Sequence, residues 1–201
     1  MIQWGYKSNK TERVVYAMFE TKDLIIRETT LEDIDIFDVW ERVPEVTKFF
    51  SIRDGQTKEE ALEKYFTDKA DPTARQFSIW LKDGDCEGDD DGEKLIGRIV
   101  LGDIIEGWKA EIWRIYIGDL PERGKGYGKQ AMQAMMKYCF DELKLERLYL
   151  DHYTGNPAAQ LYLSLGFQYE GVLRGNCRKN GILYDVHLMS IMKDEYYGLQ
   201  G

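Results

Sequence analysis

Apolar residues along this chain recur with two different spacings, and the order of these segments predicts a mixed α+β protein. Short runs rich in branched and aromatic side chains are typical of strands. They occupy about residues 24–28, 76–82, 95–105, 111–117, 147–153, 167–174 and 183–192. Segments with an apolar residue every three or four positions are typical of amphipathic helices. These are about residues 30–40, 57–69, 129–143 and 157–165.

Turn and cap residues set some of these boundaries. Thr30, with Asp33 three residues later, resembles a capping box with Asp in place of Glu, so a helix is expected to start there. Asn180-Gly181 separates the last two apolar runs, and Asn-Gly is a strong signal for a tight hairpin. We therefore expect the chain to finish its sheet with a β-hairpin.

A glycine-rich turn stands between an expected strand and an expected helix at residues 123–129. It reads Arg-Gly-Lys-Gly-Tyr-Gly-Lys. The unpaired N–H groups and the dipole at a helix N-terminus attract anions, and glycine lets the ligand approach the backbone. The basic side chains add positive charge, so the segment predicts a pyrophosphate cradle. Its residues are Arg123, Gly124, Lys125, Gly126, Tyr127, Gly128 and Lys129.

Two familiar nucleotide loops do not match this segment. The Walker loop requires Ser or Thr after Gly-Lys, and here Gln130 follows. The dinucleotide fingerprint has the spacing G-x-G-x-x-G, whereas these glycines are spaced G-x-G-x-G. The pattern that remains is R-x-x-G-x-G, from Arg123 to Gly128.

A second motif lies downstream, from Asn156 to Phe167. Asn156 is a good helix cap, Pro157 suits the first helical position, and Gly166 can end the helix in the left-handed conformation. The segment matches N-x-x-A-x-x-L-Y-x-x-x-G-F. In this order, the two motifs resemble those of the GNAT superfamily of acetyl-CoA-dependent N-acetyltransferases.

The resemblance implies a fold and a mode of cofactor binding. GNAT proteins have a three-layer α/β/α arrangement with a mixed, mostly antiparallel sheet that is splayed between strands 4 and 5. We therefore expect a single acetyltransferase domain over residues 1–201, with 1–17 as an N-terminal extension. In the family the cofactor lies in the splay, where its pantetheine arm bonds to the strand backbone. The implied positions here are Ile115, Tyr116, Ile117 and Asn156.

The resemblance also implies direct transfer of an acetyl group from acetyl-CoA, as co-substrate, to a primary amine. Tyr162 occupies the position of the tyrosine that protonates the departing CoA thiolate. Glu111 lies near the position where some members carry a catalytic glutamate, which makes it the candidate base. The weaker candidates for the base are Glu28, Asp185 and His152.

The acceptor amine stays open at this point. Residues 178–185 resemble the branch that acetylates N-terminal alanine of ribosomal proteins, but members acting on small amines share this ending. The acceptor is therefore a small molecule or a protein N-terminus. A non-catalytic acyl-CoA-binding sensor is the alternative function, and a homodimer is common in the family. Residues that could wall the amine pocket, or simply fill the core, are Trp40, Pro44, Phe49, Phe50 and Tyr184.

Composition narrows the partners and the location. A net charge of −9 argues against nucleic acid, whose phosphates require a basic surface. We expect no membrane span, no signal peptide and reduced cysteines, hence a cytoplasmic protein. Residues 83–93 hold seven acids but lack the glutamate that closes a calcium loop, so we expect a solvated turn and no metal site.

Overall fold

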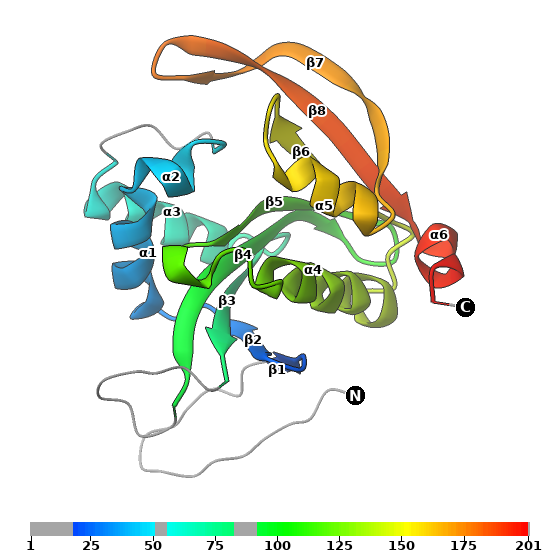
Figure 1. Ribbon diagram of the computed structural model, residues 1–201, viewed down its shortest axis with the longest axis horizontal. Helices are drawn as coiled ribbons and strands as arrows, with labels where there is room; N and C mark the ends of the chain where they lie inside the picture. Colours follow the sequence, from blue (N-terminus) through cyan, green and yellow to red (C-terminus); the bar gives the residue numbers. More distant parts are fainter. Residues whose placement is uncertain (1–17, 51–55, 83–91, 201) are drawn as a thin grey trace.

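A computed structural model describes residues 18–50, 56–82 and 92–200 (Figure 1). Its strands form one sheet in the order β1-β2-β3-β4-β5-β6-β8-β7. All neighbours are antiparallel except β5 and β6, which are parallel. This confirms the expected mixed, mostly antiparallel sheet. The strands are β1 (Met18–Glu20), β2 (Leu24–Glu28), β3 (Arg75–Leu81), β4 (Lys94–Ile105), β5 (Lys109–Ile117), β6 (Arg147–Tyr153), β7 (Gln168–Lys179) and β8 (Ile182–Met192).

Helices cover both faces of the sheet, which gives the expected three layers (Figure 1). One face carries α1 and α3, and the other carries α4 and α5. The short helix α2 follows α1, and α6 ends the described chain. The helices are α1 (Asp33–Glu41), α2 (Pro44–Thr47), α3 (Lys58–Ala70), α4 (Tyr127–Lys137), α5 (Ala158–Ser164) and α6 (Lys193–Gly198).

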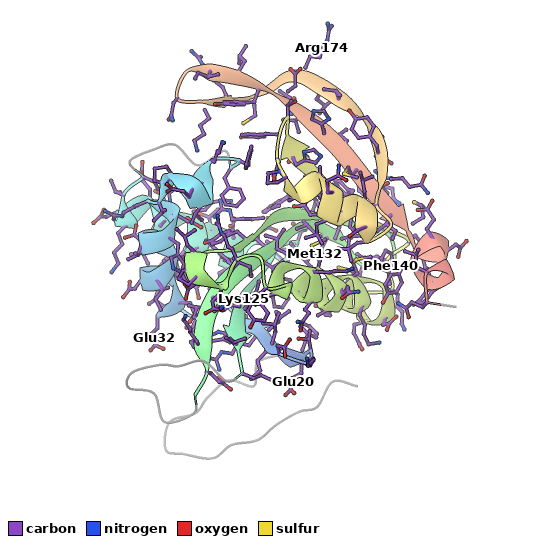
Figure 2. All side chains as sticks on the ribbon, viewed as in Figure 1. Glu20, Glu32, Lys125, Met132, Phe140 and Arg174 are labelled. Carbon is purple, nitrogen blue, oxygen red and sulfur yellow. The ribbon has the colours of Figure 1, made fainter. Side chains whose placement is uncertain are left out.

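The main core lies between α4 and the sheet. Met132 and Phe140 are both fully buried there, the latter in a π-helical turn, Tyr138–Glu142, that extends α4 (Figure 2). Apolar residues of β2, β4, β5 and β6 pack against the same side of that helix. A smaller cluster beneath α1 and α3 includes Phe37 and Tyr65. The sheet is therefore held from both sides, and this fixes the strands that carry the site.

The strands β5 and β6 separate partway along their length. They pair only from Lys109 to Ile112 on β5 and from Arg147 to Leu150 on β6. On the other edge of β5 the register to β4 shifts, because Trp113 is an extra residue between two paired positions. Such a bulge bends the strand locally. The predicted splay between strands 4 and 5 of the family is thus confirmed. These strands are β5 and β6 here, because β1 is an additional strand that precedes the first strand of the family.

Some local predictions hold and others are wrong. The hairpin turn is confirmed, with Asn180 and Gly181 both at positive φ (49° and 81°). Thr30 does not cap α1; instead its N–H donates to the Asp33 carboxylate at 2.9 Å, and the helix begins at Asp33. The short helices α2 and α6 have too few turns for a periodic apolar pattern to reveal them. The predicted extension 1–17 and residues 83–91 of the acidic segment lie outside the described residues.

Candidate active site

A cleft of about 840 Å³ occupies the splay between β5 and β6. Its walls come from α2 and the residues after it, β5, the glycine-rich turn, β6, the start of α5 and the β7–β8 hairpin. The cleft therefore joins the two motifs that the sequence singled out. Every element that lines it is fixed by the sheet or by a helix packed on the sheet.

The glycine-rich turn forms an open cradle at one end of this cleft. Gly124 and Gly126 have positive φ values of 78° and 89°, and Gly126 directly precedes α4. No side chain caps the first turn of α4. A Cβ atom added at either glycine, or at Gly128, would meet no protein atom within 4 Å. Free N–H groups facing open space are what an anion needs at a helix N-terminus.

The three basic side chains of the turn differ in their surroundings. Arg123 donates from Nε to the Ile117 carbonyl at 2.7 Å and from Nη1 to the Glu45 carbonyl at 3.0 Å, so it ties the turn to β5 and α2. Lys125 pairs with Glu122 at 2.8 Å on the surface, outside the cleft lining (Figure 2). Lys129 lines the cleft and forms no ion pair within the described chain. Arg123 and Lys129 therefore line the cradle and Lys125 does not.

The predicted pantetheine positions lie on the free edge of β5. Ile115, Tyr116 and Ile117 all line the cleft and pair with β4 on their other side. None of them pairs with β6, so backbone groups of this edge face the cleft. Unpaired strand edges bind extended ligands through main-chain hydrogen bonds. Asn156 also lines the cleft, and its Oδ1 accepts from the Ala158 N–H at 3.0 Å, which caps α5.

Tyr162 projects from α5 into the same cleft. Its side chain is buried, with 6% exposed, and its hydroxyl makes no hydrogen bond to the described residues. Burial, together with the negative charge of Asp151, raises the pKa of Tyr162 to about 12. The hydroxyl is therefore protonated at neutral pH and available as a proton donor.

Two carboxyl groups lie on neighbouring strands beside the splay, and one of them, Asp151, is close enough to raise the pKa of Tyr162. Glu111 on β5 is outside the cleft lining; burial raises its pKa to about 7, with further contributions from Asp151 and Asp103. Asp151 on β6 lines the cleft, and partial burial of its carboxyl raises its pKa as well, while His152 opposes the effect. The structure thus brings Glu111 near the site but places Asp151 in it.

Sequence reasoning missed Asp151. The available signal was its place in β6, where it interrupts an apolar strand that leads into the Asn156 motif. The weaker base candidates all lie outside the cleft lining. Asp185 accepts from the Gly175 N–H at 2.7 Å, and His152 is buried in a parallel stack on His187 with ring centres 5.1 Å apart. Glu28 lies on β2, beyond both β3 and β4 from the splay.

Of the aromatic residues considered for the amine pocket, Phe49 and Phe50 line the cleft and Trp40 and Tyr184 do not. Trp40 packs on Phe37, and Tyr184 stacks on Tyr153 at 5.1 Å. Pro44 also lies outside the lining.

Over residues 18–50, 56–82 and 92–200, no three His, Cys, Asp or Glu side chains are grouped so as to hold a metal ion. Within the same ranges, no helix has both the length and the apolar character to cross a membrane.

Comparison with known proteins also indicates an N-acetyltransferase. Residues 23–168 match the model of the acetyltransferase (GNAT) domain family. The N-acetyltransferase p20 of Bacillus licheniformis is 31% identical over 182 residues, covering 89% of this chain and 97% of the relative. Spermidine N(1)-acetyltransferase of Vibrio cholerae is 31% identical over 140 residues, covering 69% of this chain and 73% of the relative.

Solved structures show the same fold. Spermidine N-acetyltransferase from Vibrio cholerae, in complex with CoA and spermine, superposes with a TM-score of 0.74 at 25% identity, covering 88% of this chain and 99% of that one. A GNAT-family acetyltransferase from Bacillus anthracis gives a TM-score of 0.72 at 20% identity, covering 88% of this chain and 99% of that one. With the cradle, the splay and the tyrosine in one cleft, the chain belongs to the GNAT family, and it is an acetyl-CoA-dependent N-acetyltransferase that acts on amines.

Proposed function

We propose that this enzyme acetylates a small primary amine by direct transfer, with Tyr162 as the acid and the Asp151–Glu111 pair as the base. The observation that carries the proposal is the Tyr162 hydroxyl, which is protonated, free of hydrogen bonds to the described residues and located in the cleft. The cradle and the free edge of β5 account for the cofactor. The remaining wall of the cleft, on β6, faces the amine.

In the proposed complex, acetyl-CoA lies along the cleft with its pyrophosphate on the glycine-rich turn. N–H groups of the turn and the first turn of α4 bind the phosphates, with Lys129 adding charge. The pantetheine amides bond to the free edge of β5. This directs the thioester to the point where β6 and α5 approach β5. The cofactor-binding residues are then Ile115, Tyr116, Ile117, Arg123, Gly124, Gly126, Tyr127, Gly128, Lys129 and Asn156.

The acceptor must lose a proton before it can attack. A lysine-type amine has a pKa near 10.4, so presenting it neutral at pH 7 costs about 4–5 kcal/mol. Asp151 lines the cleft and has no ion-pair partner in the described chain, so it can take this proton directly or through a water. Glu111 lies close enough for the charge of Asp151 to make ionisation of the Glu111 carboxyl less favourable.

The transfer step then balances within the cleft. The neutral amine nitrogen bonds to the thioester carbonyl carbon, and the carbon–sulfur bond breaks as the tetrahedral intermediate collapses. Tyr162 donates its hydroxyl proton to the sulfur, which leaves as the CoA thiol. As the intermediate collapses, the nitrogen releases its extra proton to solvent, and solvent returns a proton to the tyrosinate. The products are the neutral acetamide and free CoA thiol.

A small amine is proposed over a protein N-terminus because the β7–β8 hairpin spans the acceptor side of the cleft (Figure 1). Near the hairpin tip, the buried Lys179 ammonium donates to the Thr47 carbonyl at the end of α2, at 2.7 Å. This hydrogen bond joins the β7–β8 hairpin to the end of α2 on the acceptor side of the cleft. The resemblance to the N-terminal alanine branch, the homodimer, the cytoplasmic location and the single domain over residues 1–201 stay predictions.

The test is release of CoA thiol from acetyl-CoA against a panel of amines and N-terminal peptides. We expect turnover of small amines, a loss of about 100-fold in Asp151→Asn and a smaller loss in Glu111→Gln. A larger loss of turnover in Glu111→Gln than in Asp151→Asn would assign the base to Glu111 alone. Turnover restricted to peptides would overturn the small-amine proposal. Tight binding of acetyl-CoA with no turnover of any amine would instead favour the sensor.

A further inference from the structure

The wall of the cleft opposite Asp151 contains a buried group of charged residues. At its centre is Glu41, the last residue of α1, which is 6% exposed. A single oxygen, Oε1, accepts from Arg98 Nη1 at 3.0 Å, from Arg114 Nη1 at 2.9 Å and from the Tyr116 hydroxyl at 2.9 Å. The two guanidinium groups hold the pKa of Glu41 below its usual value even though burial acts to raise it. Glu41 is therefore ionised.

This group carries a net positive charge. Two guanidinium groups share one carboxylate, and the other neighbours, Tyr116 and Gln76, are neutral. The other carboxylates of α1 are already engaged. Asp33 accepts from Ser78 at 2.6 Å and lies about 12 Å from Glu41 along the helix, at 1.5 Å per residue. Asp38 pairs with Arg42 at 2.8 Å.

The surplus charge reaches the cleft through Arg114. Its side chain keeps 17% of its area exposed, it lines the cleft, and its guanidinium lies 5.8 Å from the ring of Phe50 on the same wall. Only one of its five N–H donors is used by the described residues. Within that part of the chain, the buried side-chain nitrogens without a partner are Trp80 Nε1 and Arg98 Nε. The unused nitrogens of Arg114 are therefore accessible from the cleft.

The two walls of the cleft thus have opposite charges where β5 and β6 separate. Arg114 supplies a cation on β5, and Asp151 supplies a carboxylate on β6 that forms no ion pair with the part of the chain that the structure describes. Apart from the glutamate directly before the glycine-rich turn, the remaining acid of the lining is Glu45. Burial lowers the pKa of Arg123, and Glu45 lies close enough to Arg123 to oppose part of that effect. This places Glu45 toward Arg123, and within residues 18–50, 56–82 and 92–200 the carboxylate that pairs with Arg114 is the shared Glu41.

Resting on the proposed function, we propose that the acceptor is a primary amine that also carries an anionic group. Arg114 binds that group, a carboxylate or a phosphate, while the amine is directed to Asp151 on the other wall. A planar guanidinium with free donors suits either anion. A polyamine has no anionic group and would place a second ammonium against the surplus positive charge. The acceptor class therefore differs from the spermine bound in the Vibrio cholerae structure.

The test compares amines in matched pairs that differ only in the anion. One pair is an α-amino acid and its amide, and the other is an amino sugar phosphate and its unphosphorylated amino sugar. Two quantities are measured: kcat/KM in the thiol-release assay, and calorimetric affinity for the protein saturated with CoA. We expect the anionic member of at least one pair to be favoured about tenfold or more in both, the scale of one charge-assisted hydrogen bond.

The preference is expressed as the ratio of kcat/KM, or of affinity, for the anionic amine to that for its uncharged partner. Arg114→Gln should bring this ratio to within about threefold of unity, and Arg114→Lys should retain part of the preference. Arg42→Gln is the matched control, because Arg42 lies on the surface beside the same helix and outside the cleft lining. Its ratio should equal that of the wild type. The pair that responds identifies a carboxylate or a phosphate as the anion.

A wild-type protein that favours the uncharged amines or a polyamine in both measurements would overturn the proposal, whatever the variants do. So would an anion preference that survives in a folded Arg114→Gln protein. Failure of the proposed function is a separate result. Turnover would then be absent, and the calorimetric preference in the CoA-bound protein would still decide the role of Arg114.

Discussion

The two ends of the cleft are built in different ways. The cofactor end is one continuous stretch of chain, the glycine-rich turn and the start of α4, and it offers mainly backbone N–H groups in open space. The acceptor end is assembled from side chains of α1, β4, β5 and β6, which are far apart in sequence. Arg98 and Glu41 are 57 residues apart, and Arg114 and Glu41 are 73 apart.

This difference separates two kinds of recognition. A backbone cradle depends on conformation, so glycines and a helix start are sufficient to bind the phosphates of the cofactor. Side-chain recognition depends on which charges meet in space, so it can change without altering the cradle. We therefore expect the first kind to determine cofactor binding and the second to determine which amine is acetylated.

The largest effect is expected for Tyr162→Phe, which tests proton donation to the CoA sulfur where the two ends of the cleft meet. Removing the proton donor should lower kcat about 100-fold, within the range for loss of general acid catalysis. KM for acetyl-CoA should change less than about twofold, because the cradle is untouched. Tyr153→Phe serves as the control, since Tyr153 also lines the cleft but stacks on Tyr184. Equal kcat in wild type and Tyr162→Phe would remove Tyr162 from the mechanism.

The pH dependence of kcat tests the carboxyl pair. With its pKa at about 7, Glu111 is about half protonated at pH 7 and mostly protonated at pH 6, so wild-type kcat should fall about fivefold between these two pH values. Glu111→Gln removes this titrating group, so we expect the fall to move to lower pH, where Asp151 is the carboxyl that titrates. An unchanged pH profile in the variant would exclude coupling between the two carboxyls.

The same substitution has an effect on stability with a definite sign. The pKa of Glu111 in the folded protein is above its ordinary value of 4.5, so its contribution to stability is complete below pH 4.5 and is lost as pH rises through 7. Above pH 8 we expect Glu111→Gln to be more stable than wild type by about 1–2 kcal/mol, because solvent access reduces the full effect of the shift. Urea titrations at pH 5 and pH 8 measure this difference.

At the cofactor end, Gly126→Ala should raise KM for acetyl-CoA about fivefold to tenfold. Alanine is strained at a φ of 89° by about 1–2 kcal/mol, and the added methyl group enters the space where a phosphate would lie. Gly107→Ala is the matched control, with a φ of 72° and equally open surroundings, but in the β4–β5 turn outside the cleft. Both variants should lose stability and only Gly126→Ala should lose affinity. A similar KM in both would show that strain alone is responsible.

The smallest expected effect is a difference in KM for acetyl-CoA between variants of two lysines in the same turn. Lys129→Ala should raise KM for acetyl-CoA about threefold, because Lys129 lines the cleft with its charge uncompensated by an ion pair in the described chain. Lys125→Ala should leave KM nearly unchanged, since that ammonium already pairs with Glu122 on the surface. A larger effect at Lys125 would place the phosphates on the outer side of the turn.

The sequence predicted most of what depends on local chain properties. Most of the strand segments, the glycine-rich turn, the hairpin turn and the helix that carries Tyr162 follow from periodicity, glycine placement and caps, whereas the arrangement of the sheet was implied by the family resemblance. The roles of Asp151 and Arg114 could not be predicted in this way. Each gains its proposed role only where β5 and β6 separate. The pairing of β5 with β6 ends at Ile112, whereas its pairing with β4 continues to Ile117. Lys125 and Lys129 looked alike in sequence, and only their neighbours distinguish them.

We expect cofactor binding and acetyl transfer to depend on separate parts of one cleft. The decisive experiment measures two quantities on the same preparations of Gly126→Ala, Tyr162→Phe and Asp151→Asn: the calorimetric Kd for acetyl-CoA and kcat at saturation. We predict that Gly126→Ala weakens binding and keeps most of kcat, whereas Tyr162→Phe and Asp151→Asn lose kcat and keep the wild-type Kd. Loss of acetyl-CoA affinity in Tyr162→Phe, with kcat at saturation preserved, would show that the two parts of the cleft are not separate.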